Sequence, residues 1–187
     1  ADSGPAEGAS GVLARAALGY GGTGRFGGVF DPYLEVDATL VGLLDRAIDA
    51  CPRDDEATRA RLMGRLAQAL YWSGEKERMR DLSQDALEIA RRTGDATAIA
   101  YGLHSRHVAL WGPDYVAEVR GAAEEMLTLG VSLGDRDIQL MAYTWLITDA
   151  LETDPIEKVV QEIPELEALV PRQDTCDRWL AALPCPS

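Results

Sequence analysis

The feature that most constrains this chain is an aspartate that recurs every 40 residues, at Asp55, Asp95 and Asp135. Each aspartate precedes a run in which apolar side chains recur at a spacing of three to four, the pattern of an amphipathic helix. Aspartate favours the N-cap, because its carboxylate accepts hydrogen bonds from the free N–H groups of the first helical turn. Gly94 and Gly134 precede two of these aspartates, where a helix commonly ends in the left-handed conformation. The pattern therefore predicts tight helix-to-helix turns with a period of 40 residues.

A repeat of this length predicts helix pairs that bury their apolar faces only by stacking on their neighbours. A rival period of 34 residues, the usual tetratricopeptide length, relates Trp111, Trp145 and Trp179. We favour 40 because it keeps the helix caps in register, whereas 34 aligns the tryptophans alone. No segment shows a sustained alternation of apolar and polar residues, so we expect no sheet. The predicted fold is all-α, a superhelical array of antiparallel helix pairs of the tetratricopeptide-like kind.

The expected helices share apolar periodicity and are bounded by aspartate, glycine or proline. They cover about residues 10–20, 33–50, 56–72, 76–92, 96–111, 114–132, 136–151, 156–169 and 173–183. Asp31 and Asp154 are further expected N-caps, each followed by proline, and Glu157 completes a capping box with Asp154. Helix 136–151 is apolar on nearly all sides and should lie sandwiched. The first helices of the pairs keep a charged face and should line one surface.

The expected domain organisation has three parts. Residues 1–9 are expected to be a disordered segment, 10–170 the repeat domain with a glycine-rich loop at 19–28, and 171–187 a short terminal helix and tail. That loop matches G-x-G-x-x-G twice, but a dinucleotide site needs a strand before the motif, and a helical stretch precedes it here. The P-loop motif is absent from the sequence, so we expect no nucleotide cofactor.

Charge and cysteine usage indicate the setting of the chain. It has 31 acidic and 18 basic residues, a net charge of −13, which argues against binding to duplex nucleic acid. Residues 1–92 have a net charge of −3 and residues 93–187 of −10, so the second half should attract a basic partner surface. No apolar run is long enough for a membrane span, and no signal-peptide pattern opens the sequence. Cys51, Cys176 and Cys185 form no C-x-x-C pair, which indicates a reduced, cytoplasmic protein.

Two histidines are the main candidates for catalysis or metal binding. His104 and His107 share one helix face and could hold a metal, but no third ligand is evident nearby. Ser105 lies between them without a nucleophile-elbow motif. Glu124 and Glu125 point about 100° apart on a helix and do not converge. We therefore expect structural histidines, no metal, no cofactor and no catalysis; a histidine-dependent enzyme would need a third convergent polar group.

Three segments are similar to a known protein family. They are Arg61–Ala67, Leu82–Arg92 and His104–Asp114, the last of which reads HSRHVALWGPD. The region from 62 to 154 resembles the helical-repeat region of large ATP-binding LuxR-type (MalT-like) transcriptional regulators and of related cyclase-associated ATPases. The likeness covers about half the chain well and residues 10–60 more loosely. It implies a piece of a larger regulator, whose nucleotide site and DNA-binding module lie elsewhere.

Two functions follow as expectations. The first is a non-catalytic protein-interaction or sensing module whose groove holds a protein or peptide partner; a homodimer stays open. The second is a small-molecule receptor for an inducer, with its cavity between helices 56–72, 96–111 and 136–151. Aromatic residues and arginine dominate binding hot spots, so aromatic side chains at helix ends are the candidate anchors. The candidate binding residues are Tyr71, Trp72, Arg106, His107, Trp111 and Tyr143.

Overall fold

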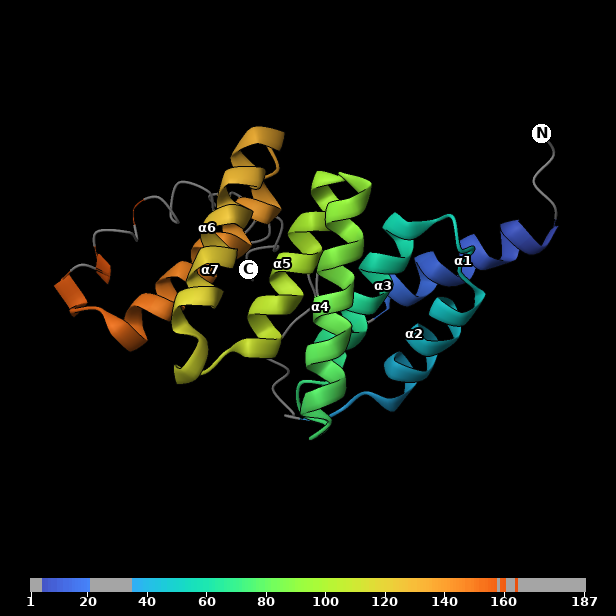
Figure 1. Cartoon of the computed structure of the whole chain (residues 1–187), viewed down its shortest axis with the longest axis horizontal. Coiled ribbons are helices and arrows are strands. Elements are labelled where there is room, and N and C mark those ends of the chain that lie inside the picture. Colours follow the sequence, from blue (N-terminus) through green and yellow to red (C-terminus); the bar gives the residue numbers. More distant parts are fainter. Residues whose placement is uncertain (1–4, 21–34, 158, 161–163, 165–187) are drawn as a thin grey trace, which may run out of the picture.

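The computed structural model describes residues 5–20, 35–157, 159–160 and 164. Over these residues the chain is helical and contains no strand, which confirms the all-α prediction (Figure 1). The elements are α1 (Pro5–Gly19), α2 (Ala38–Ala50), α3 (Glu56–Ala69), α4 (Lys76–Thr93), α5 (Ala96–Leu110), the 3₁₀ helix η1 (Pro113–Tyr115), α6 (Val116–Leu133) and α7 (Arg136–Thr153). In this part of the chain, no helix is both long and apolar enough to cross a membrane.

The three aspartates at 40-residue spacing cap helices as predicted. The Asp55 carboxylate accepts a hydrogen bond from the backbone N–H of Thr58 at the start of α3. Asp95 accepts one from Ala98 at the start of α5, over 2.7 Å. Asp135 does the same for the first turn of α7. The preceding glycines, at 94 and 134, have φ of 68° and 63°, a conformation that a side chain disfavours. These three aspartates therefore begin α3, α5 and α7, as expected from the sequence.

Two helices begin elsewhere than predicted. α1 begins at Pro5, so residues 5–9 are helical and not part of a disordered segment. Proline suits the first helical position because its fixed φ is already helical. α2 begins at Ala38 and not near residue 33, because Asp37 provides the N-cap: its carboxylate accepts hydrogen bonds from the backbone N–H groups of residues 39 and 40. The predicted cap Asp31 lies outside the described residues.

At the other end, Asp154 ends α7, and its carboxylate accepts a hydrogen bond from Arg120 in α6 over 3.0 Å. Residues 156–157 and 159–160 are helical, which matches the start of the helix expected at 156–169. The expected helix 173–183, the glycine-rich loop from 21 onward, Cys176, Trp179 and Cys185 lie outside the described residues.

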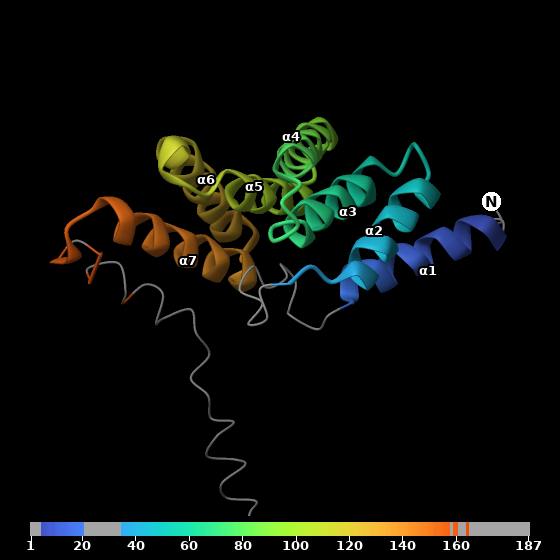
Figure 2. The ribbon, with the colours of Figure 1, turned by 90° about the horizontal axis from the view of Figure 1, so that it is seen from below.

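The helices pack on their chain neighbours, and α3 also packs on α5. One buried cluster joins α1, α2 and α3 to the start of α4, through residues such as Leu44 and Leu66. A second cluster joins α5, α6 and α7 to Leu87 of α4, through residues such as Met126 and Trp145. Figure 2 shows α1 and α7 at opposite ends of the molecule, with α3, α4 and α5 between them. The core is therefore divided along the chain and joined at α4 and α5.

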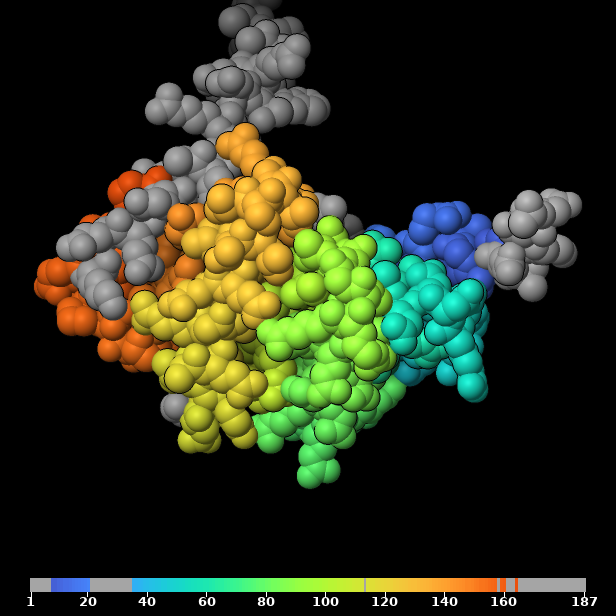
Figure 3. Space-filling view, turned by 45° about the horizontal axis from the view of Figure 1, so that its top comes forward, coloured from blue at the N-terminus to red at the C-terminus, as the bar shows by residue number. Residues whose placement is uncertain are grey.

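The second helix of each expected pair should be the more buried one, and among these helices α5 is the most buried. Eleven of its 15 residues are buried, whereas α7 has six buried residues and an exposed Leu151. α4 and α6 lie side by side on the face seen in Figure 3. An ion pair between Arg91 of α4 and Glu125 of α6 crosses between them, with 2.7 Å from nitrogen to oxygen. Both helices expose charged side chains there, as predicted for the first helices of the pairs.

Candidate functional site

A cleft of about 220 Å³ lies where the end of α5 and η1 meet the start of α4. Its aromatic lining comes from Tyr71, which follows α3, from Trp111, which ends α5, and from Tyr115 of η1. The Tyr71 and Trp111 rings are stacked, with centroids 6.3 Å apart. Gly112 permits the turn between α5 and η1, because its φ of 157° is one that other residues rarely adopt. The cleft is thus built from the ends of three helices.

Two cations lie over the aromatic walls of this cleft. The Lys76 ammonium is 4.6 Å from the centroid of the Tyr71 ring and donates a hydrogen bond to the Tyr71 carbonyl over 2.8 Å. The Arg80 guanidinium lies 5.5 Å from the centroid of the Tyr115 ring. Both arrangements are cation–π contacts. Lys76 and Arg80 are four residues apart on α4 and therefore share one helix face.

The charge of the cleft differs from that of the whole chain. The cleft contains Lys76 and Arg80 against a single acid, Asp114, in a protein of net charge −13. Burial, and secondarily the Glu152 carboxylate, raises the pKa of Tyr71 above its usual value. Its phenol therefore stays protonated at neutral pH and can donate a hydrogen bond. The cleft offers aromatic surface, two cations and two phenol hydroxyls, a combination that suits an acidic group beside an apolar one.

Trp72 extends the aromatic surface to the outside of the molecule. Its side chain is 43% exposed, and its ring meets the Tyr71 ring edge-on at 4.8 Å between centroids. On the inner side, Trp111 meets the buried Trp145 of α7 at 5.6 Å. A continuous row of aromatic rings therefore runs from the exposed Trp72 to the core between α5 and α7.

Behind this row lies a buried polar layer between α5 and α7. The Trp145 indole N–H donates a hydrogen bond to Nδ1 of His104 over 2.9 Å, and the Trp145 ring stacks on His107 at 4.1 Å. Nε2 of His107 lies 3.0 Å from a carboxylate oxygen of Asp149, and these two side chains are 1% and 2% exposed. Ser105 donates a hydrogen bond to the carbonyl of Gly102 in its own helix.

In this layer both histidines are buried and contact side chains of α7. His107 does have a polar partner that the sequence did not indicate, since Asp149 is 42 residues away on another helix. The pair is buried in the core, where it links α5 to α7. In the described part of the chain, no group of three histidine, cysteine or acidic residues is placed to hold a metal ion.

The remaining predicted site residues lie apart from the cleft. Arg106 is engaged with Glu118 of α6, over 3.0 Å from Nε to carboxylate oxygen. Tyr143 is partly buried against the core cluster of α5, α6 and α7. The structure therefore brings together Tyr71, Trp72 and Trp111, and separates Arg106, His107 and Tyr143 from the cleft. Glu124 and Glu125 do not converge: they pair with different arginines, Arg120 and Arg91.

Four residues that are candidates for binding in the structure were not identified from the sequence. Lys76 and Arg80 could have been found as two cations at helical spacing just after Tyr71-Trp72. Arg65 and Gln68 of α3 are 7% and 6% exposed, although charged and amide side chains are seldom so buried. No sequence signal distinguishes them, because their burial depends on how α3 packs.

Comparison with protein families finds no family model that matches this chain, and comparison with curated proteins finds no sequence match.

Proposed function

We propose that this chain is a non-catalytic interaction module whose cleft at Tyr71, Trp111 and Tyr115 holds a peptide segment of a partner protein. The observation that carries the proposal is the combination of these rings with Lys76 and Arg80 in one cleft. Tryptophan, tyrosine and arginine dominate the energetics of protein interfaces. The exposed Trp72 next to the cleft adds an anchor that the fold leaves uncovered.

The size of the cleft favours a side chain over a whole small molecule as its occupant. Its 220 Å³ is below the range of about 300–1,000 Å³ that is usual for small-molecule pockets. Its cations favour an acidic residue of the partner, next to an aromatic or apolar one that packs on the rings. The acidic half of the chain, residues 93–187, favours basic residues elsewhere on the same partner.

The wider setting is also part of the proposal. We propose that the helix pairs continue as a tetratricopeptide-like superhelix and that the chain is a piece of a cytoplasmic ATP-binding regulator of the LuxR type. The resemblance of the segment His104–Asp114 to that family supports this setting. The cleft is formed largely by the same segment, because Trp111, Gly112 and Asp114 line it.

Selection from a displayed library of random peptides tests the proposal. We expect enriched peptides to combine an acidic with an aromatic residue. Their affinity, measured by fluorescence anisotropy, should fall at least tenfold in a Lys76→Glu/Arg80→Glu variant, because a charge reversal repels the acid. Arg46→Glu is the matched control, since Arg46 is on α2 and donates to a carbonyl of its own helix.

Trp72→Ala should weaken peptide binding with little change in melting temperature, because the side chain is 43% exposed. Two results would contradict the proposal: no peptide family is enriched, or the enriched peptides bind all these variants as well as the parent chain.

A further inference from the structure

The face of α3 that carries Arg61, Arg65 and Gln68 contains polar groups that the structure leaves without partners. These residues are spaced by four and three, so they lie on one face of the helix, and span about 10 Å along it. Neither Arg61 nor Arg65 makes an ion pair or hydrogen bond with the described residues, although Arg65 is only 7% exposed. Nε of Arg61 and both amide atoms of Gln68 are buried without a hydrogen-bond partner.

A buried polar group without a partner lowers the stability of the fold, because burial removes its hydrogen bonds to water and nothing replaces them. Neighbouring arginines show that the fold can provide partners. Arg59, on the same helix, donates to the carbonyl of Cys51 over 2.9 Å. The unpartnered atoms of Arg61 and Gln68, on the same helix face as the buried Arg65, therefore indicate a site that is complete only with a ligand.

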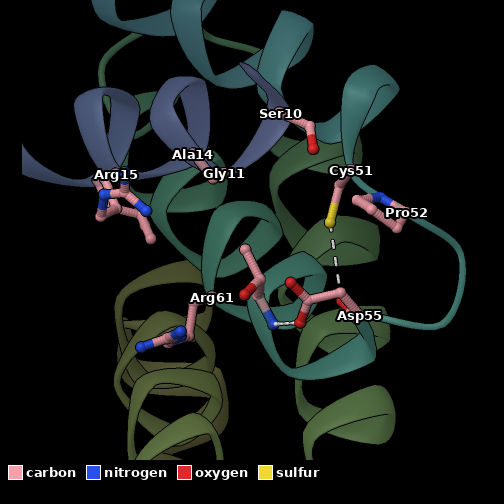
Figure 4. A pocket seen from close by; sticks show the side chains of 10 residues that line it. Ser10, Gly11, Ala14, Arg15, Cys51, Pro52, Asp55 and Arg61 are labelled. Atoms are coloured by element: carbon pink, nitrogen blue, oxygen red, sulfur yellow. Dashed lines mark hydrogen bonds between the residues drawn. The ribbon is translucent and has the colours of Figure 1, made fainter. Parts of the chain in front are cut away.

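A cavity of about 340 Å³ opens at the N-terminal end of this face, between α1, the turn after α2, and α3. Its lining includes Arg15 of α1 and Arg61 of α3, together with Cys51, Pro52 and Thr58. Figure 4 shows the two arginines on one side of the view and Cys51 with Pro52 on the other. The volume is within the range of about 300–1,000 Å³ that is usual for small-molecule pockets.

The charges of this cavity favour an anion. Arg15, like Arg61, makes no hydrogen bond or ion pair with the described residues, and both guanidinium groups are charged at neutral pH. The one carboxylate in the lining is that of Asp55, which is already used to cap α3. Burial raises the pKa of the Cys51 thiol, so the sulfur stays neutral and does not offset the arginines. The described lining of the cavity therefore has two arginines against one carboxylate, an excess of one positive charge.

We propose that this cavity and the adjoining face of α3 bind a small organic molecule with two acidic groups, carboxylate or phosphate. One acidic group pairs with Arg15 and Arg61, which line the cavity, and the other extends along α3 toward Arg65 and Gln68, which lie outside that lining. Guanidinium groups suit this role because their paired donors match the geometry of carboxylate and phosphate oxygens. The proposal is independent of the peptide cleft, which lies beyond the other end of α3.

Titration calorimetry of the full chain with citrate, succinate and pyrophosphate, at constant ionic strength, tests the site and separates carboxylate from phosphate chemistry. We expect saturable binding of at least one probe with one-to-one stoichiometry. The affinity should fall at least tenfold in Arg61→Gln and in Arg65→Gln, and should be unchanged in the surface control Arg46→Gln. Trp72→Ala should leave anion binding intact, which separates this site from the proposed peptide cleft.

Arg65→Met gives a second readout that does not depend on the choice of probe. Without anion, this variant should melt several degrees above the parent chain, because an apolar side chain of similar length replaces a buried cation that makes no ion pair with the described residues. The site is overturned if no probe binds saturably, or if Arg46→Gln weakens binding as much as Arg61→Gln. A lower melting temperature for Arg65→Met would also overturn it, since Arg65 would then have a structural partner.

Discussion

Buried polar side chains in the described part of the chain are concentrated on α3, α5 and α7. They are Arg65, Gln68, His104, Ser105, His107 and Asp149, with Ser83 of α4 as a seventh. Those of α5 and α7 each make a hydrogen bond, within their own helix or between the two helices, although Nδ1 of His107 has no partner. On α3, both amide atoms of Gln68 lack a hydrogen-bond partner, and Arg65 interacts electrostatically with Tyr101. At the residue scale, burial therefore has two meanings here: a hydrogen-bonded layer between α5 and α7, in which only Nδ1 of His107 lacks a partner, and a face of α3 at which we propose a ligand.

The buried pair of His107 and Asp149 yields a prediction. His107→Leu should lower the free energy of unfolding by about 3 kcal/mol, because it leaves the Asp149 side chain buried without its partner. The double variant His107→Leu/Asp149→Leu should recover most of this loss, since it removes both polar groups. Urea denaturation followed by circular dichroism measures both values. A double variant no more stable than the single one would show that the pair is not the source of the loss.

At the scale of the helices, close approach depends on glycine at two crossings. A Cβ added to Gly102 of α5 would lie 2.9 Å from Cα of Leu87 in α4. A Cβ added to Gly130 of α6 would lie 2.9 Å from the backbone nitrogen of Gln139 in α7. In both cases the obstacle is backbone, which does not move aside as a side chain end can. These glycines let α4 approach α5, and α6 approach α7, more closely than larger residues would.

Gly102→Ala should therefore destabilise the protein by about 1–3 kcal/mol, the usual cost of overpacking a core. Alanine normally stabilises a helix relative to glycine, so the sign of this change is informative. Gly121→Ala in α6 is the matched control, because nothing lies within 4 Å of its added Cβ. That variant should gain up to about 1 kcal/mol. Thermal denaturation of the two variants checks the contrast, and a gain in both would refute the close crossing.

Over its described residues, the molecule is a row of helices whose two larger buried clusters meet at α4 and α5. α1 and α2 contribute to one cluster, and α6 and α7 to the other. Arrays of this kind are held together by contacts between neighbours, so their ends open at lower cost than their middle. α4 and α5 are packed from both sides, whereas α1 has only α2 and α3 as partners among the described elements.

Amide hydrogen exchange should show this gradient along the chain. We expect the slowest exchange in the middle of α4 and α5, and faster exchange in α1, because opening α1 leaves the second cluster intact. Mass spectrometry of peptides from the native protein measures the rates element by element. Equal protection of α1 and α5 would mean that the described helices unfold as a single cooperative unit.

The local features of the fold could be predicted from the sequence because they depend on near neighbours in the chain. A capping carboxylate and the N–H groups that it accepts from are two or three residues apart, so Asp55, Asp95 and Asp135 fix three helix starts by themselves. The left-handed glycines before two of them act at equally short range. The predicted start of α2 was wrong because either Asp31 or Asp37 could provide the N-cap, and the local sequence does not show which of the two does.

The candidate sites depend on contacts between distant parts of the chain, and tertiary structure alone decided them. His107 and Asp149 are 42 residues apart, and Arg15 and Arg61 meet at one cavity from different helices. Whether an arginine finds an acid, as Arg91 does, or is buried without one, as Arg65 is, depends on which helix packs against it. Helical periodicity states which face of a helix is buried, but not what lies opposite, and the partner on the opposite helix determines the chemistry of a site.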